Sequence, residues 1–268
     1  MKDLDGPAPA LLRLLAIMSR LRAPDGCAWD REQDFDSIAP YTIEEGFEVA
    51  DGIARRDWAG LQDELGDLLF QVVYHAQMAS EAGLFGFSEV AKSISDKMIR
   101  RHPHVFGEEA ARDAATQVRA WDDVKAAERS ARREVGTLAG VPSTLPALTR
   151  AAKLTRRAAR VGFDWADPAA VIDKLDEEVR EVRAELPGAD PARLADEVGD
   201  LLFVVANLAR KLDLDPEACL RGANAKFERR FNSVEAALAS QGRAPADATL
   251  DEMEELWSAA KDAERETG

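Results

Sequence analysis

Two groups of carboxylate residues share one spacing along the sequence. Both follow the pattern Glu-Glu-x-x-Glu and, further on, Glu-x-Gly-Asp-Leu-Leu-Phe. Each member of the second group lies 133 positions after its counterpart, as from Glu44 to Glu177. A repeat of this length indicates a duplicated domain rather than the short unit of a solenoid. The groups comprise Glu44, Glu45, Glu48, Glu64 and Asp67, and Glu177, Glu178, Glu181, Glu197 and Asp200.

The spacing within each group favours a metal site. Glu45 and Glu48 are three residues apart, as are Glu64 and Asp67, and residues at this spacing share a helix face. Two antiparallel helices with a short connection would bring the pairs together. Converging carboxylates repel one another unless protons or cations neutralise them, and an all-oxygen set without Cys or His favours Mg²⁺, Mn²⁺ or Ca²⁺ over zinc. The predicted ligands are Glu45, Glu48, Glu64, Asp67, Glu178, Glu181, Glu197 and Asp200.

The alternative is that these acids only form a solvated surface, since charged residues make up 32% of the chain and mostly lie outside. Two features favour the metal site. The Leu-Leu-Phe run that follows each acid pair is expected to be buried. Both halves also keep the acids although neighbouring residues differ, for example Phe47 against Arg180.

Basic and aromatic residues recur in both halves as well. Lys226 and Arg230 lie four residues apart, as do Trp257 and Lys261, and the first half has Lys97, Arg101, Trp121 and Lys125 at similar places. Lys and Arg beside a metal–carboxylate cluster suit a polyphosphate. A Trp in this setting either stacks on a base or packs in the core.

The elements that must position these residues are helices, because the apolar residues recur with helical periodicity and no alternating strand pattern is present. We expect an all-α fold of two helical bundles, 1–134 and 147–268, joined by the segment 135–146. Thr42 and Ser88 are expected to cap helices, and 102–107 to form a loop. The predicted helices are 10–21, 43–55, 61–82, 87–101, 116–133, 148–161, 168–186, 191–212, 216–240 and 250–264.

Composition narrows the class of protein further. The formal net charge of −15 disfavours binding to a nucleic-acid polymer or an anionic membrane. Cys27 and Cys219 have no metal-ligand spacing and are predicted to be free thiols. The N-terminus lacks the pattern of a signal peptide and no apolar run is long enough to span a bilayer, so a soluble cytoplasmic protein is expected.

Taken together, the repeated acid motif, the run Lys226–Phe231 and the pair Trp257 and Lys261 resemble the MazG family of two-domain nucleoside triphosphate pyrophosphohydrolases. The resemblance extends from about Leu11 to Lys261. It implies the all-α fold shared with dimeric dUTPases, a homodimer, and Mg²⁺-dependent hydrolysis of a nucleoside triphosphate to its monophosphate and diphosphate, as in the removal of unwanted nucleotides.

The resemblance also implies roles for residues of the second half. Glu178, Glu181, Glu197 and Asp200 would ligate the metal, and Glu177 would orient or activate water, so that Glu177, Glu178 and Glu197 form the predicted catalytic set. Nucleotide contacts would come from Lys226, Arg230, Trp257 and Lys261. Turnover is expected mainly in the second half, since the first has His102-Pro103-His104 where the second has Phe231-Asn232-Ser233.

Two other classes of function remain open from the residues themselves. One is a non-catalytic, regulatory helical protein that binds a divalent metal. The other is an adaptor whose apolar helices only dimerise. A di-iron bundle is disfavoured, because none of His75, His102 and His104 follows the acids at the Glu-x-x-His spacing.

Overall fold

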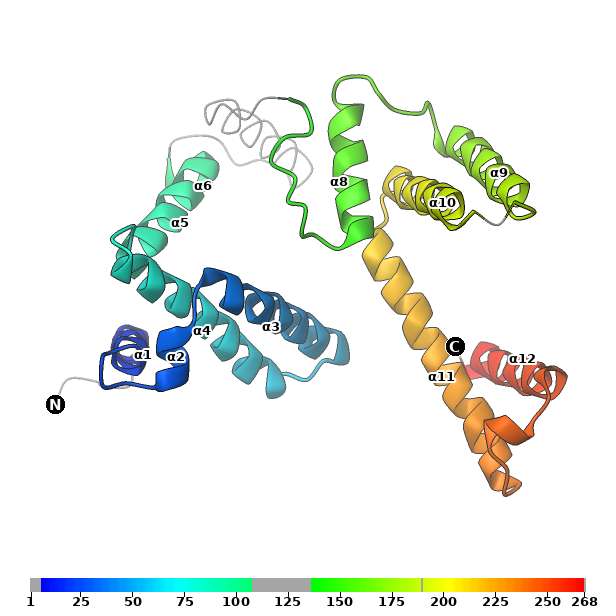
Figure 1. Ribbon diagram of the computed structural model, residues 1–268, viewed down its shortest axis with the longest axis horizontal. Coiled ribbons are helices and arrows are strands. Elements are labelled where there is room, and N and C mark those ends of the chain that lie inside the picture. Colours follow the sequence, from blue (N-terminus) through cyan, green and yellow to red (C-terminus); the bar gives the residue numbers. More distant parts are fainter. Residues whose placement is uncertain (1–5, 108–135, 189, 268) are drawn as a thin grey trace. The chain divides into compact units, whose positions relative to one another are not determined.

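A computed structural model describes residues 6–107, 136–188 and 190–267, and every regular element within them is a helix. The expected all-α fold class is therefore confirmed. The chain divides into two compact units, Met1–Val124 and Lys125–Gly268 (Figure 1). The predicted helix 116–133, with Trp121 and Lys125, lies outside the described residues. The domain limits at 134 and 147 stay a prediction.

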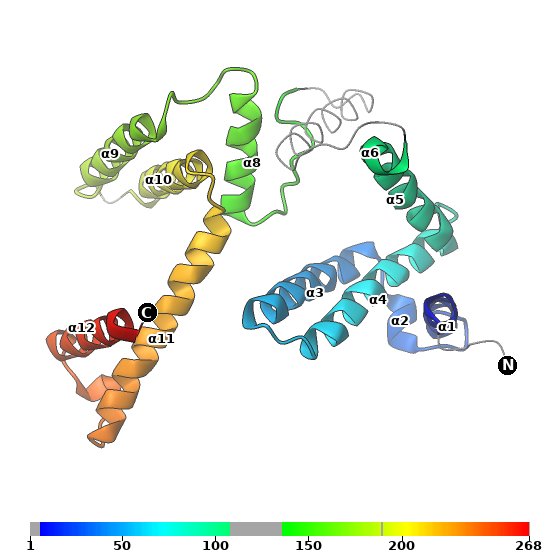
Figure 2. The same ribbon diagram turned by 180° about the vertical axis from the view of Figure 1, so that it is seen from behind.

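The first unit is built around an antiparallel pair of long helices, α3 and α4, which lie side by side in Figures 1 and 2. Helix α1 packs across α4. The core of this unit combines Met18 of α1, Ile38 of α3, and Val73, Tyr74 and Met78 of α4. The helices are α1 (Pro7–Leu21), α2 (Ala28–Glu32), α3 (Phe35–Arg55), α4 (Gly60–Glu81), α5 (Phe87–Arg101) and α6 (Pro103–Phe106).

The second unit repeats this pair as α9 and α10, with α8 packed on α10 (Figure 1). The long helix α11 follows, and α12 packs against it. Asp167, Asp190 and Asp215 cap α9, α10 and α11, and each is followed by a proline that starts the helix. The helices are α8 (Ala147–Ala159), α9 (Pro168–Glu185), α10 (Pro191–Lys211), α11 (Pro216–Ser240) and α12 (Leu250–Thr267), with a 3₁₀ turn at Pro245–Asp247.

The start of α3 differs from the prediction. Asp34 caps the helix by accepting a hydrogen bond from the Ser37 backbone N–H at 2.8 Å, and the Ser37 hydroxyl accepts from the Asp34 N–H at 3.0 Å. Thr42 therefore lies inside the helix, with its hydroxyl 2.9 Å from Nε2 of His75. Pro40 is also inside the helix rather than at its start. The predicted cap at Thr42 is wrong, because the side-chain cap at Asp34 starts the helix two turns earlier.

Two smaller expectations in the first unit are also wrong. Helix α5 begins after Gly86, whose N–H donates to the Glu89 carboxylate at 3.0 Å, so Ser88 is not the cap. The predicted loop 102–107 contains the short helix α6, since Pro103 occupies the first helical position, where its missing N–H has no partner to lose.

Both acid-bearing helix pairs end in the same kind of turn. The residue that follows α4 and its cap is Gly83, with φ +67°, and the residue at the corresponding place after α10 is Asp213, with φ +56°. Leu84 and Leu214 then donate backbone hydrogen bonds to the carbonyls of Ala79 and Ala209. The second unit thus holds a non-glycine residue in the left-handed region.

Cys27 and Cys219 are free, as predicted, and both are exposed, one in each unit. Among the described residues, no helix is both long and apolar enough to cross a membrane.

Candidate metal centres

The first unit brings three of its predicted ligands together between α3 and α4. Carboxylate oxygens of Glu45, Glu48 and Glu64 lie within 4.8 Å of one another. Partial burial, followed by repulsion from Asp67 and Glu48, raises the pKa of Glu45. Partial burial and the charge of Glu48 also raise the pKa of Glu64. Asp67 is thus a close neighbour of the group of three, and in the described part of this unit no ion pair offsets the negative charge of the cluster.

The second unit forms the corresponding cluster between α9 and α10. Oxygens of Glu178, Glu197 and Asp200 lie within 4.8 Å of one another. Glu181 adjoins them, since burial and the charges of Glu178 and Glu197 raise its pKa. Glu178 is only 3% exposed, whereas its counterpart Glu45 is half-buried. The second cluster is therefore set deeper in its helix pair than the first.

The carboxylate of Glu178 has one partnered oxygen and one unpartnered oxygen. Lys174, one turn earlier on α9, places its ammonium 2.8 Å from Oε1 of Glu178 and 2.8 Å from Oε1 of Glu177. These bonds raise the pKa of Lys174 and lower that of Glu177. Oε2 of Glu178 is buried and has no hydrogen-bond partner among the described residues. A buried carboxylate oxygen without a partner is costly, and a bound cation is one way to satisfy it.

The two clusters differ in the residue one turn before the paired acids. The counterpart of Lys174, 133 positions earlier, is Tyr41. The ring of Tyr41 packs edge-on against Trp29, with centroids 6.3 Å apart. Within the described part of the chain, no ion pair involves Glu44, Glu45, Glu48 or Glu64. Of the two clusters, as far as the described residues extend, the second alone has a side-chain cation paired with one of its acids.

The predicted nucleotide contacts lie on α11 and α12. Arg230 pairs with Glu264 at 2.8 Å and lies over the ring of Trp257, 5.7 Å from its centroid. Trp257 is half-buried against Phe227, with ring centroids 5.2 Å apart, so part of it belongs to the core. Lys226 and Lys261 are exposed. Across the described residues, no hydrogen bond or ion pair joins this basic set to the acids of α9 and α10.

The Leu-Leu-Phe runs are less buried than expected. Leu69 is 41% exposed, and Leu202 and Phe203 are 52% and 38% exposed. The exposed apolar positions match between the units, because each face follows one side of α4 or α10. We call these the apolar faces; they comprise Leu65, Leu69 and Val72 in the first unit and Val198, Leu202 and Val205 in the second. The expectation that the runs are fully buried is wrong for a single chain.

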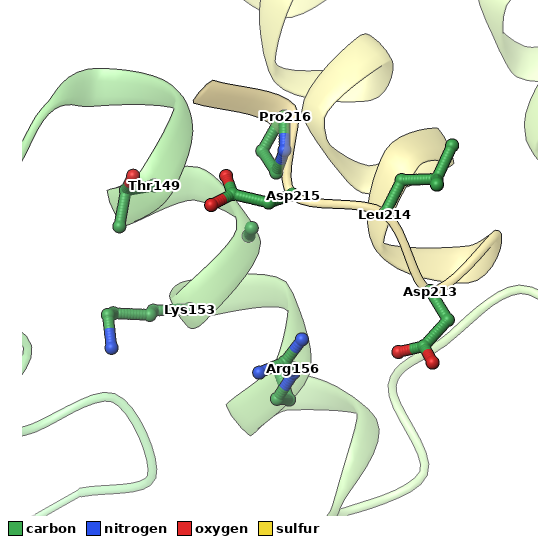
Figure 3. A pocket seen from close by; sticks show the side chains of 8 residues that line it. Thr149, Lys153, Arg156, Asp213, Leu214, Asp215 and Pro216 are labelled. Carbon is green, nitrogen blue, oxygen red and sulfur yellow. The ribbon is translucent and has the colours of Figure 1, made fainter. Parts of the chain in front are cut away.

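Two surface hollows differ in whether they contain residues of the predicted sites. One, of about 520 Å³, runs along α3 and includes Glu44 and Glu48 of the first cluster. The other, of about 320 Å³, lies between α8 and the turn before α11 and contains none of the predicted residues. Figure 3 shows its lining, which comes from Thr149, Lys153 and Arg156 on α8 and from the 213–216 turn. The one feature of the sequence that could have pointed to this hollow is the composition of α8, which has four basic residues and no acidic residue.

Comparison with known proteins connects both units to one family. The family model of the MazG nucleotide pyrophosphohydrolase domain matches residues 33–106 and 166–235. A nucleoside triphosphate pyrophosphohydrolase of Escherichia coli K12 is 49% identical over 93% of this chain and 96% of its own length. A Thermotoga maritima protein described as nucleoside triphosphate pyrophosphohydrolase/pyrophosphatase MazG is 39% identical over 92% and 94%. The uncharacterized protein YabN of Bacillus subtilis is 42% identical over 93% of this chain and 51% of its own.

Proposed function

This chain belongs to the MazG family of nucleotide pyrophosphohydrolases, and from that premise we propose that it hydrolyses nucleoside triphosphates at the cluster of its second unit. Water attacks the α-phosphorus, the bond from that phosphorus to the bridging oxygen breaks, and diphosphate leaves with the nucleoside monophosphate as the other product. The observation that carries the choice of unit is the buried, unpartnered oxygen of Glu178, for which the first cluster has no equivalent among the described residues.

The residues of the second cluster suit a hard divalent cation. The donor set consists only of carboxylate oxygens, three of them within 4.8 Å, which is the ligand type that Mg²⁺ and Mn²⁺ prefer. Glu178, Glu197 and Asp200 would hold the ion, with Glu181 beside them. When bound, Mg²⁺ polarises the phosphate and makes water more acidic. The same ligand type supports a metal site at Glu45, Glu48, Glu64 and Asp67 of the first unit.

The remaining residues of the site act on water and on phosphate. Glu177 has an exposed carboxylate with a lowered pKa, so it stays ionised and can accept a hydrogen bond from the attacking water. Lys226 and Lys261 are exposed cations that would stabilise the negative charge of the leaving diphosphate. Arg230 and Trp257 would contact the nucleotide from the α11–α12 pair.

A homodimer is part of this proposal. The apolar face of α10 presents Leu202 and Val205 to solvent in the single chain, and burial of such side chains favours association. The basic set is not bonded to the acids within the described chain, so a second copy that covers the apolar faces could also complete the nucleotide site.

The test is release of diphosphate from a panel of nucleoside triphosphates, with and without Mg²⁺. We expect metal-dependent release by the wild type and a loss of roughly 100-fold or more in Glu197→Ala, since that change removes a metal ligand from the reacting centre. Glu64→Ala is the matched control, because it removes the corresponding acid of the first unit and should retain most of the activity.

Each of the other outcomes contradicts a definite part of the proposal. Full activity in Glu197→Ala with loss in Glu64→Ala would move turnover to the first unit. No release from any triphosphate, with the metal still bound, would favour a regulatory metal-binding protein instead.

A further inference from the structure

The ammonium of Lys174 occupies the position of a counter-ion in the second cluster. It lies 2.8 Å from both Glu177 and Glu178, and Glu178 is a buried member of the group of three acids. A divalent ion bound by Glu178 would stand close to this positive charge. At a separation of a few ångströms, a monovalent and a divalent cation still repel each other when the effective dielectric constant is about 20.

We propose that Lys174 is a built-in competitor for the divalent cation, which keeps the second cluster weak for the free ion and makes metal and polyanionic substrate bind together. The inference rests on the proposed function for the identity of the substrate. Without nucleotide, the ion must enter a cluster whose charge Lys174 already offsets. With a polyphosphate, its negative charge compensates for the excess positive charge that Lys174 and the ion create together.

The first unit provides an internal comparison. Tyr41 stands where Lys174 stands in the second unit and packs against Trp29, and within the described ranges no ammonium is paired with the acids of the first cluster. Carboxylate oxygens of Glu45, Glu48 and Glu64 lie within 4.8 Å of one another, and an entering cation would directly relieve the repulsion between them. The first cluster is therefore expected to bind the free ion more tightly than the second, although it is the less buried of the two. On this proposal the first cluster binds the free ion, whereas the second binds the ion together with the substrate.

The first experiment measures Mn²⁺ binding by calorimetry in the full chain with one cluster disabled at a time. With the first cluster disabled by Glu45→Gln and Glu64→Gln, Lys174→Met is expected to tighten Mn²⁺ binding roughly tenfold or more. Lys174→Arg keeps the charge and should remain near the parent value. Unchanged or weaker binding in Lys174→Met would overturn the proposal and leave Lys174 as a structural partner of Glu178.

The reciprocal variant protects the test against a folding defect in Lys174→Met. With the second cluster disabled by Glu178→Gln and Glu197→Gln, Tyr41→Lys should weaken Mn²⁺ binding at the first cluster by a similar factor. Tyr41→Met is its uncharged control and should not weaken binding in that way. An equal effect of the two substitutions would contradict a role for the charge.

The second experiment measures the coupling between metal and substrate. A triphosphate with a non-hydrolysable α,β link should tighten Mn²⁺ binding at the second cluster, and the factor should shrink in Lys174→Met. An undiminished factor would overturn the cooperative part of the proposal. Mn²⁺ binding is measured without turnover, so tighter binding in Lys174→Met would support this proposal even if no triphosphate were hydrolysed. Failure of this proposal can therefore be told apart from failure of the proposed hydrolase function.

Discussion

At the scale of single residues, the two clusters show how one substitution changes an otherwise repeated site. Glu45 and Glu178 occupy equivalent positions, yet Glu178 is nearly fully buried and paired with a lysine, whereas Glu45 is half-buried and has no lysine partner among the residues that the structure describes. The spacing of the acids was readable from the sequence, and so was the i to i+4 spacing of Lys174 and Glu178. The depth of burial was not, because it depends on how α9 and α10 pack.

The raised pKa values of Glu45 and Glu64 predict how metal affects the stability of the first unit. For a carboxyl group whose pKa is raised on folding, the stabilising contribution is present at low pH and lost as the pH rises through the folded-state pKa. Added Mg²⁺ should therefore raise the melting temperature more at about pH 7.5 than at about pH 5, as measured by scanning calorimetry. In Glu45→Gln with Glu64→Gln that difference should decrease, and an unchanged difference would contradict metal binding by these acids.

At the scale of elements, helical periodicity predicted the long helices well and their starts less well. Helix α11 begins and ends within a residue of its prediction, because Asp215 and Pro216 mark its start. Helix α3 begins eight residues before the predicted 43. The prediction placed the helix start just after Pro40, whereas in the structure the helix starts at the capping box of Asp34 and Ser37. The acid pairs were predictable because their spacing repeats, whereas the exposure of the apolar faces depends on contacts that a single chain does not supply.

The turns after α4 and α10 give a prediction about stability. Asp213 holds φ +56° where the first unit uses Gly83, and a side chain in this region costs about 1 kcal/mol. Asp213→Gly should therefore stabilise the second unit by up to about 1 kcal/mol, measured by denaturant unfolding. Gly83→Ala is the converse change and should destabilise, although a Cβ there would meet no other atom within 4 Å. Destabilisation by Asp213→Gly would show that the Asp213 side chain contributes more than its backbone strain costs.

At the scale of the whole molecule, duplication has given the chain two similar helix pairs with matching apolar faces. Leu69 and Leu202 occupy equivalent, exposed positions on α4 and α10. An exposed apolar face that recurs in both copies supports the proposed homodimer, whereas single exposed apolar residues carry little meaning.

The proposed homodimer is tested by placing a charge on one apolar face at a time. Leu202→Glu should weaken the dimer roughly 100-fold or more, because each copy loses the burial of one leucine and must bury or expose a carboxylate instead. Sedimentation velocity at several concentrations measures the change. Leu69→Glu is the matched variant of the first unit and shows whether that face also contributes. An unaltered dimer in both variants would contradict association through these faces.

The two cysteines have a practical consequence for studying the protein in solution. Cys27 and Cys219 are exposed and lie in different units, so the native chain already carries one labelling handle on each. Nitroxide spin labels attached to them would give an interspin distance by pulsed electron resonance without any engineered residue. The distance would be recorded before and after addition of nucleotide and Mg²⁺, which is diamagnetic and does not disturb the spin labels. A change in the distance would show that binding of metal and nucleotide alters the arrangement of the two units.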